Sequence, residues 1–184
     1  MRIITGKLKG HHLKTPATTK TRPVTDMMRG AIFSILENMV EDWSQVLDLF
    51  AGSGALGIEA LSRGAEWADF VESERKCCVI IKENLEATRL TVQAKVYCCS
   101  VEKALGFLDK EYNIILMDPP YANPTTGDII TRLGESGLVG AKTALVVSHS
   151  SRLPLNQRYG TLNNVKETRH GDSCISIYKK ETIS

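Results

Sequence analysis

A glycine-rich turn limits the folds open to this chain more than any other feature of its sequence. Residues 48–57 read Asp-Leu-Phe-Ala-Gly-Ser-Gly-Ala-Leu-Gly. The apolar run 46–50 predicts a buried strand before the turn, and residues 55–63 predict a helix behind it. Gly52, Gly54 and Gly57 have the G-x-G-x-x-G spacing, which lets a strand turn sharply into a helix and lets the backbone approach a ligand closely. An α/β domain that binds a ligand at this turn is therefore expected.

The alternation of apolar runs and amphipathic stretches continues beyond the turn. Strands are predicted over residues 68–72, 94–99, 112–117 and 144–149, and helices over residues 26–40, 75–88, 101–108 and 127–135. Strand–helix alternation predicts a parallel sheet that is covered by helices on both faces. Residues 160–168 and 174–179 flank a polar turn, which predicts a C-terminal antiparallel hairpin near one edge of the sheet.

Length and composition indicate one globular domain. A chain of 184 residues can bury a sizeable core, and 42% hydrophobic with 24% charged residues excludes general disorder. No apolar run is long enough to span a bilayer and no signal peptide is apparent, so we expect a cytoplasmic protein, and a monomer by default. The cysteines lack zinc-site spacing, so we expect free thiols and no metal at Cys77, Cys78, Cys98, Cys99 and Cys174.

Positive charge is concentrated at the start of the chain. Residues 1–30 hold seven cations and one anion, whereas the remainder holds sixteen cations and twenty anions. The seven cations are Arg2, Lys7, Lys9, Lys14, Lys20, Arg22 and Arg29. A basic segment on an acidic body favours a polyanionic partner such as nucleic acid, although a solvated tail has the same composition. We expect residues 1–24 to form a basic arm or a small hairpin, and residues 25–184 to form the main domain.

Two carboxylates decide which ligand suits the turn. Glu72 ends the second predicted strand, where a carboxylate can bind ribose hydroxyls. Asp48 ends the first strand, where it would repel a pyrophosphate but attract the cationic amino-acid end of S-adenosylmethionine. Asp48 and Glu72 together therefore favour S-adenosylmethionine over a dinucleotide as the ligand. They also argue against a turn that binds no ligand. The adenine is expected to lie beside the residues that follow the third strand. The predicted cofactor-binding residues are Asp48, Phe50, Ala51, Gly52, Ser53, Gly54, Glu72, Ser100 and Val101.

A second motif, Asp118-Pro119-Pro120-Tyr121, directly follows the fourth predicted strand. The carboxyl ends of strands one and four of a doubly wound sheet flank one crevice, so the motif is expected beside the cofactor. The exocyclic amine of a base is a poor nucleophile, because its lone pair is delocalised into the ring. Asp118 and the Pro119 carbonyl could each accept one amine hydrogen and direct the lone pair at a methyl group. Pro120 would keep the turn rigid and Tyr121 would stack on the base, although a rigid turn without function is the alternative.

These motifs resemble a known family. Residues 48–65, residues 118–121 and the Thr-Arg-Pro-Val-Thr-Asp of residues 21–26 are similar to the bacterial RsmD-type enzymes, and the resemblance covers nearly the whole chain. It implies a Rossmann-like class I S-adenosylmethionine-dependent methyltransferase domain over residues 25–184, with a seven-stranded, mostly parallel sheet. It implies methyl transfer to the N2 amine of a guanine in small-subunit (16S) ribosomal RNA, within a ribosomal particle. The residues predicted to contact RNA, from the arm and from the family's closing segment, are Arg2, Lys7, Lys9, Arg22 and Thr25.

Alternatives stay open from the sequence alone. The tetrapeptide recognises an amine rather than one base, so an adenine-N6 or cytosine-N4 methyltransferase acting on RNA or DNA fits the same motifs. The glycine spacing alone fits a nicotinamide-dependent oxidoreductase, and the arm alone fits a non-catalytic RNA-binding protein. The chain also departs from RsmD-type enzymes at Val24, usually threonine, and at Ser148 and His149, where a carboxylate often ends the fifth strand.

Overall fold

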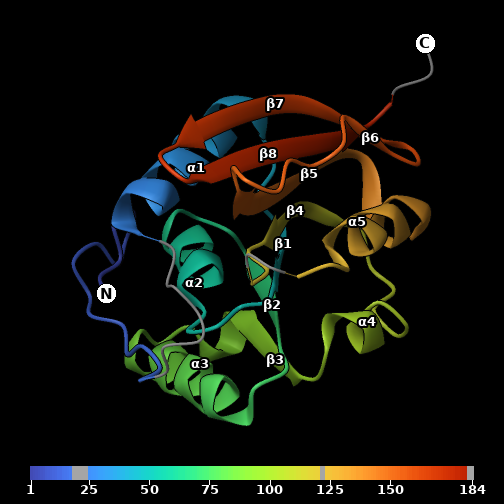
Figure 1. The fold of residues 1–184 in the computed structure, drawn as a ribbon. Coiled ribbons are helices and arrows are strands. Elements are labelled where there is room, and N and C mark those ends of the chain that lie inside the picture. Colours follow the sequence, from blue (N-terminus) through green and yellow to red (C-terminus); the bar gives the residue numbers. More distant parts are fainter. Residues whose placement is uncertain (18–24, 121–122, 182–184) are drawn as a thin grey trace.

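The computed structural model describes residues 1–17, 25–120 and 123–181, which are built around one mixed sheet (Figure 1). The strand order is β3-β2-β1-β4-β5-β8-β7-β6. The parallel strands are β1 (Gln45–Leu49), β2 (Trp67–Glu72), β3 (Ala94–Cys98), β4 (Tyr112–Met117) and β5 (Val139–Ser150). The antiparallel strands are β6 (Arg158–Tyr159), β7 (Leu162–His170) and β8 (Ser173–Lys180). The predicted α/β class, the mostly parallel sheet and the C-terminal hairpin are confirmed.

Two strands differ from the prediction. The sheet has eight strands rather than seven, because Arg158 and Tyr159 pair with the start of β7 at the outer edge. β5 begins at Val139 rather than at residue 144. The Thr143 hydroxyl accepts a hydrogen bond from the Gly140 amide (2.8 Å) and donates one to the Tyr112 carbonyl (2.5 Å). The bond from Thr143 to Tyr112 keeps the first half of β5 attached to β4. Apolar periodicity could not indicate this contact between two strands.

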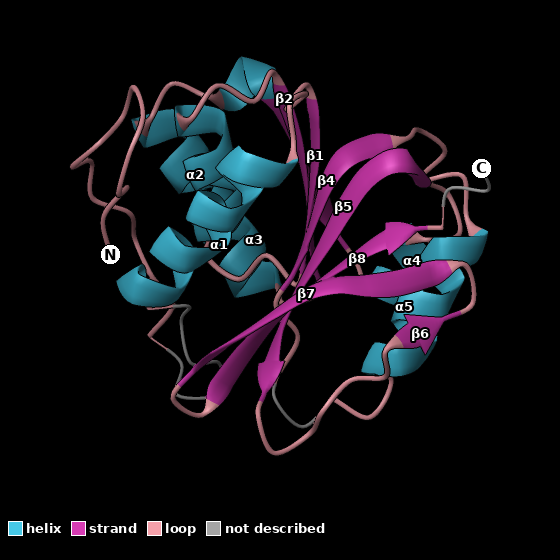
Figure 2. Cartoon of the chain, turned by 90° about the horizontal axis from the view of Figure 1, so that it is seen from above, coloured by secondary structure: helices cyan, strands magenta, loops and turns pink. Residues whose placement is uncertain are grey.

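Helices cover both faces of the sheet (Figure 2). On one face lie α1 (Asp26–Met39), α2 (Ala55–Ser62) and α3 (Arg75–Ala87), and on the other lie α4 (Val101–Ala104) and α5 (Thr126–Glu135). A short 3-10 turn, Thr91–Gln93, precedes β3. Each face has its own apolar core, and each fully buried aliphatic side chain contributes about 1.5–3 kcal/mol. Among the described residues, no helix combines the length and apolar character needed to cross a membrane.

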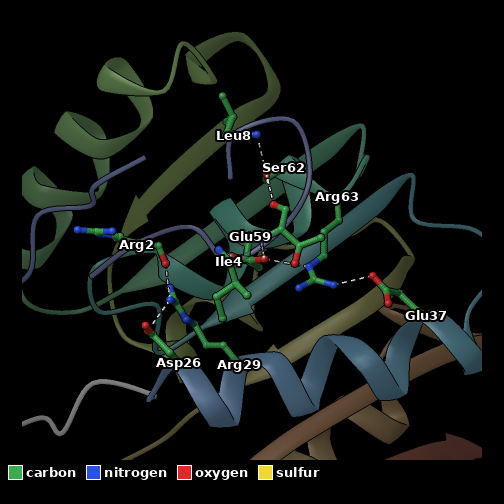
Figure 3. A network of polar contacts seen from close by, with 10 residues as sticks. Arg2, Ile4, Leu8, Asp26, Arg29, Glu37, Glu59, Ser62 and Arg63 are labelled. Carbon is green, nitrogen blue, oxygen red and sulfur yellow. Dashed lines mark hydrogen bonds and ion pairs between the residues drawn. The ribbon is translucent and has the colours of Figure 1, made fainter. Parts of the chain in front are cut away.

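Polar contacts hold the start of the chain, at residues 4–8, against α2 (Figure 3). The Glu59 carboxylate, fully buried in α2, accepts hydrogen bonds from the backbone amides of Ile4 (2.8 Å) and Thr5 (3.0 Å). Its further partner is the Arg63 guanidinium, whose Nε donates at 3.0 Å. A buried charge is tolerated when it is paired and hydrogen-bonded in this way. The start of the chain is thereby fixed to the helix that follows the glycine-rich turn.

Residues 2–12 form a hairpin-like turn that reaches the C-terminal end of α2. An antiparallel bridge joins Arg2 to His12. The Lys7 amide donates to the Ser62 carbonyl (2.8 Å), and the Leu8 amide donates to the Ser62 hydroxyl (3.0 Å). Ser62 is the last residue of α2, so the turn that contains Lys7 lies at the end of the helix remote from the glycine-rich turn. The boundary between arm and main domain at residue 24 lies outside the described residues and stays a prediction.

Candidate active site

The two sequence motifs meet at the carboxyl edge of the sheet. Leu49 of β1 pairs with Met117 of β4, and Met117 pairs with Val147 of β5. Neighbouring strands lie about 4.8 Å apart, so the residues adjacent to these three in sequence are close in space. Asp118 and Ser148 directly follow Met117 and Val147, and Asp48, which pairs with Leu116, lies one strand over and two residues back from Asp118. The structure therefore brings together the carboxylates of both motifs and adds a hydroxyl from the fifth strand.

The glycine-rich turn keeps its backbone open toward this edge. Phe50, a residue with a Cβ, has a φ of 58°, and Gly52 has a φ of 57°. A left-handed Phe costs roughly 1–3 kcal/mol, a cost that persists where the surrounding structure fixes the backbone. The Ala51 amide fixes it by donating to the Val71 carbonyl (3.0 Å). A Cβ placed on Gly52 would meet nothing within 4 Å, which leaves space beside the backbone for a ligand.

Asp48 is a buried carboxylate that is only half satisfied. Its side chain is 1% exposed, and its Oδ2 accepts a hydrogen bond from the Gly57 amide (2.8 Å). Its Oδ1 has no hydrogen-bond partner among the described residues. Burial raises the pKa of Asp48 to about 8, against the opposing effect of the Gly57 bond and with additions from the charges of Asp118 and Glu72. A cationic ligand group at Oδ1 would supply the missing partner, so the amino group of S-adenosylmethionine fits this residue.

Glu72 connects the two loops that would surround a ribose. Its Oε2 accepts from the Gly52 amide (2.8 Å), and its Oε1 accepts from the Glu74 amide (2.8 Å). Oε1 also accepts from the Ser73 hydroxyl (3.5 Å), whereas Oε2 has a second lone pair that can accept a bond from a ribose hydroxyl. Glu72 is half-buried, which leaves the carboxylate accessible from the ligand side. The chemistry of this position fits a nucleoside.

The other residues predicted to bind the cofactor differ in what they offer. Ala51 and Ser53 are buried, and the Ser53 carbonyl accepts a hydrogen bond from Asn84 Nδ2 (3.0 Å). Ser100 is exposed and begins α4, where its hydroxyl accepts from the Lys103 amide (3.3 Å). Val101 is buried and offers an apolar surface. The prediction that Ser100 and Val101 hold the adenine stays a prediction.

Asp118 accepts a hydrogen bond from Ser148, a residue of β5 that belongs to neither sequence motif. The Ser148 hydroxyl donates a hydrogen bond to Asp118 Oδ1. Burial raises the pKa of Asp118 to about 6, and the Ser148 bond opposes that shift. Pro119 is buried and Pro120 is exposed. Tyr121, the fourth residue of the predicted catalytic set, lies outside the described residues.

His149, next to Ser148, belongs to a hydrogen-bond network that reaches β8 and β7. Its Nε2 lies 2.9 Å from the Ser176 hydroxyl of β8, which donates to Glu167 Oε2 of β7 at 2.9 Å. Its Nδ1 faces the carbonyls of Ser150 (3.1 Å) and Leu153 (3.3 Å). These contacts link three adjacent strands, which is a sufficient reason for a histidine at this position.

The residues predicted to contact RNA are spread over the molecule. Thr25 begins α1, where its hydroxyl accepts from the Met28 amide at 3.2 Å. The Arg2 carbonyl lies close by and accepts from Arg29 Nη2 (2.5 Å). The turn that contains Lys7 and Lys9 lies instead at the end of α2 remote from the candidate site. Arg22 lies outside the described residues.

Similarity to known proteins places the chain in a family. Residues 1–179 match the model of the family described as Conserved hypothetical protein 95. YlbH of Bacillus subtilis (strain 168) is 37% identical over 183 residues, which cover 98% of this chain and 99% of that protein. Ribosomal RNA small subunit methyltransferase D of Escherichia coli (strain K12) is 35% identical over 181 residues, which cover 98% of this chain and 90% of the relative.

Solved structures agree with this assignment. The structure of yhhF from Escherichia coli superposes with a TM-score of 0.87 at 30% identity and covers 100% of this chain and 99% of its own. That of TTHA0928 from Thermus thermophilus superposes with a TM-score of 0.83 at 32% identity, covering 96% of this chain and 98% of its own. The fold is thus the Rossmann-like class I methyltransferase fold, and the chain belongs to the Conserved hypothetical protein 95 family.

Proposed function

We propose that this protein transfers the methyl group of S-adenosylmethionine to the exocyclic N2 amine of a guanine in small-subunit ribosomal RNA. The observation that carries the proposal is the placement of Asp48 and Asp118 at the ends of the adjacent strands β1 and β4. Asp48 offers a buried acceptor for a cation, and Asp118 offers an acceptor for an amine. The name of the Escherichia coli relative, Ribosomal RNA small subunit methyltransferase D, supports ribosomal RNA as the substrate.

S-adenosylmethionine, when bound, supplies an electrophilic methyl group on a sulfonium. Asp48 would hold its amino group through Oδ1, and Glu72 would hold its ribose hydroxyls. The backbone at Gly52 allows close approach because no Cβ occupies that side. Binding a cation would also favour the ionised form of Asp48, so it would lower the pKa that burial has raised.

The amine of the base would be fixed by two acceptors, Asp118 and the carbonyl of Pro119. An ionised carboxylate is an acceptor at both oxygens and the stronger acceptor, and the bond from Ser148 favours that form. Fixing the amine removes its freedom to rotate and aims the lone pair at the methyl group, which is catalysis by orientation. Transfer would form the nitrogen–carbon bond as the sulfur–methyl bond breaks and the neutral thioether S-adenosylhomocysteine leaves. The Asp118 carboxylate would accept the extra proton that the nitrogen then carries.

A substitution of Asp118 separates this function from its alternatives. We expect Asp118→Ala to bind S-adenosylmethionine within about threefold of wild type, because Asp118 does not hold the cofactor, but to lose about 100- to 1,000-fold in methyl transfer. Cofactor affinity is measured by calorimetry and transfer with labelled cofactor. Undiminished transfer would contradict the proposal. Binding of a nicotinamide dinucleotide in place of S-adenosylmethionine would favour the oxidoreductase alternative.

We further propose that the protein acts as a cytoplasmic monomer on a small-subunit particle rather than on free RNA. The resemblance to RsmD-type enzymes, which implies a substrate already associated with ribosomal proteins, supports the particle. Rates of transfer to purified 16S RNA and to small-subunit particles test the preference directly. Higher rates on the free RNA would contradict it.

A further inference from the structure

The carboxyl edge of the sheet beyond β5, the edge at which Asp118 also lies, carries two exposed arginines. Arg152 lies in the loop after β5, and its side chain is 81% exposed. Arg169 is exposed near the end of β7. Neither belongs to the basic segment at the start of the chain, so charge patterning alone did not assign them to RNA binding. We refer to Arg152 and Arg169 as the edge-arginine pair.

Strand pairing places Arg169 at the carboxyl edge of the sheet, on the face of His149, whereas Ser148 and Asp118 lie at the same edge on the opposite face. Arg169 pairs with Cys174 of β8, and Cys174 pairs with His149 of β5, so the Cα of Arg169 lies about 10 Å from that of His149. Arg152 follows Ser148 by four residues, which limits its distance from Ser148 to about 14 Å of extended chain. The two arginines therefore flank the end of β5, whose Ser148 holds Asp118.

A backbone contact fixes the loop of Arg152 against the turn that follows Arg169. The Ser151 amide donates to the Asp172 carbonyl (2.9 Å), and Ser150 pairs with Ser173. The positions of the two arginine backbones relative to each other thus follow from the sheet itself. A phosphate-binding pair benefits from such preorganisation, because less conformational entropy is lost on binding.

The present contacts of the pair leave donors for a phosphate. Arg152 Nη2 lies 3.8 Å from Asp172 Oδ2, and both side chains are largely exposed, so this ion pair is weak and easily exchanged. Arg169 Nε donates to the Gly171 carbonyl (2.9 Å), which uses one of the five N–H donors of its guanidinium. The neighbouring acidic group Glu167 already accepts a bond from Ser176. A phosphate can therefore replace weak interactions with charge-assisted, bidentate ones.

We propose that the edge-arginine pair binds backbone phosphates of the substrate RNA beside the target nucleotide. The inference rests on the proposed function, because it names the surface on which that substrate lies. It adds a second candidate RNA-contacting surface to the basic segment, whose Lys7 and Lys9 stay predicted RNA contacts. Those lysines lie at the far end of α2, a helix of eight residues and about 12 Å.

The experiment compares two double variants that each remove two positive charges. Arg152→Ala/Arg169→Ala removes the pair, and Lys95→Ala/Lys142→Ala removes exposed lysines near the amino ends of β3 and β5, on the opposite edge of the sheet. For methyl transfer to small-subunit particles we expect the first variant to raise KM about tenfold or more, with kcat and cofactor affinity changed less than twofold. The plot of log affinity against log salt should lose a slope of about 2, since each phosphate contact contributes about 0.9.

The control variant is expected to change KM less than twofold. Arg152→Lys/Arg169→Lys, which keeps the charges but loses the bidentate geometry, should lie between wild type and the alanine variant. Equal KM values for Arg152→Ala/Arg169→Ala and for Lys95→Ala/Lys142→Ala would overturn the proposal. If wild type methylates no RNA at all, the proposed function fails instead. Retention of particles on filters then still compares the variants, and equal retention would overturn the edge-arginine pair separately.

Discussion

Asp118 at the end of β4 accepts a hydrogen bond from the hydroxyl of Ser148 at the end of β5. The two residues meet because Met117 and Val147, their neighbours in sequence, pair in the parallel sheet. The bond restrains the carboxylate and favours its ionised form, while burial favours the protonated form and raises the pKa to about 6. Ser148 thus helps to keep the acceptor of the amine ionised near neutral pH.

Removal of this hydroxyl should change the pH dependence of the reaction. In Ser148→Ala the pKa of Asp118 should rise further, because a bond that lowers it is lost. A rise of about one unit, equivalent to about 1.4 kcal/mol, should lower methyl transfer at pH 6.5 roughly threefold, with recovery toward wild type at pH 8.5. Ser148→Thr keeps the hydroxyl and should follow the wild-type profile. A profile for Ser148→Ala that coincides with wild type would contradict the assigned role.

Asp48 should be required for cofactor affinity. Asp48→Asn keeps the shape and an acceptor for the Gly57 amide but removes the charge that faces the ligand. A hydrogen bond to a charged group is worth about 1.5–3 kcal/mol, so the Kd for S-adenosylmethionine should rise about 10- to 150-fold. Calorimetry measures the effect directly. An unchanged Kd would show that Asp48 does not hold the amino group.

The same residue should make the ligand-free protein less stable as pH rises. Between pH 3.8 and about 8, folded Asp48 keeps a proton that the unfolded chain releases. The folded state then binds more protons than the unfolded state, so the free energy of unfolding falls as pH rises through this window. Asp48→Asn carries no such proton. Its Tm at pH 8 should exceed that of wild type, and the difference should shrink toward pH 5; a constant difference would contradict this explanation.

Asn84 of α3 should stabilise the glycine-rich turn. Its Nδ2 donates to the carbonyls of Ser53 and Lys14 (both 3.0 Å), and its Oδ1 accepts from the Lys14 amide (2.8 Å). Asn84→Asp keeps the shape but loses both donors, and leaving buried carbonyls without partners should cost about 2 kcal/mol or more. Urea unfolding measures this loss. Asn38→Asp, at an exposed position of α1, is the control and should cost less than about 0.5 kcal/mol.

Glu59 should anchor the first residues of the chain. In Glu59→Gln one carboxylate oxygen becomes an amide donor that faces other donors, so we expect a loss of about 3 kcal/mol in the free energy of unfolding. Glu37 also pairs with Arg63, at 2.5 Å, but it is exposed. Glu37→Gln should therefore cost less than about 1 kcal/mol. Equal losses for the two variants would show that burial of Glu59 contributes nothing.

Local patterns were sufficient to predict most of the fold. The helix expected at residues 75–88 is found at Arg75–Ala87, because its apolar spacing and its ends are properties of neighbouring residues. The positions of Asp48, Glu72 and Asp118 at the carboxyl ends of strands could be predicted for the same reason, since local sequence identifies each of the three strands. The two-residue strand β6 could not be predicted, because its existence depends on pairing with β7.

The rest of the site depends on contacts between distant segments. Nothing near Ser148 in the sequence indicates that it will face Asp118, and nothing near Arg169 indicates that β8 will bring it toward β5. The location of Lys7 follows from the burial of Glu59, an acidic residue in a helix that is otherwise apolar. Charge patterning therefore found a basic segment but could not show which edge of the sheet it approaches.

The most direct test of the proposed function is the identity of the methylated nucleoside. Small-subunit particles that lack the modification are incubated with the protein and labelled S-adenosylmethionine, and the RNA is digested to nucleosides. We predict that the label appears as N2-methylguanosine and that Asp118→Ala abolishes it. Label in methyladenosine or methylcytidine would contradict the guanine target, and absence of label from all nucleosides would contradict the proposed function itself.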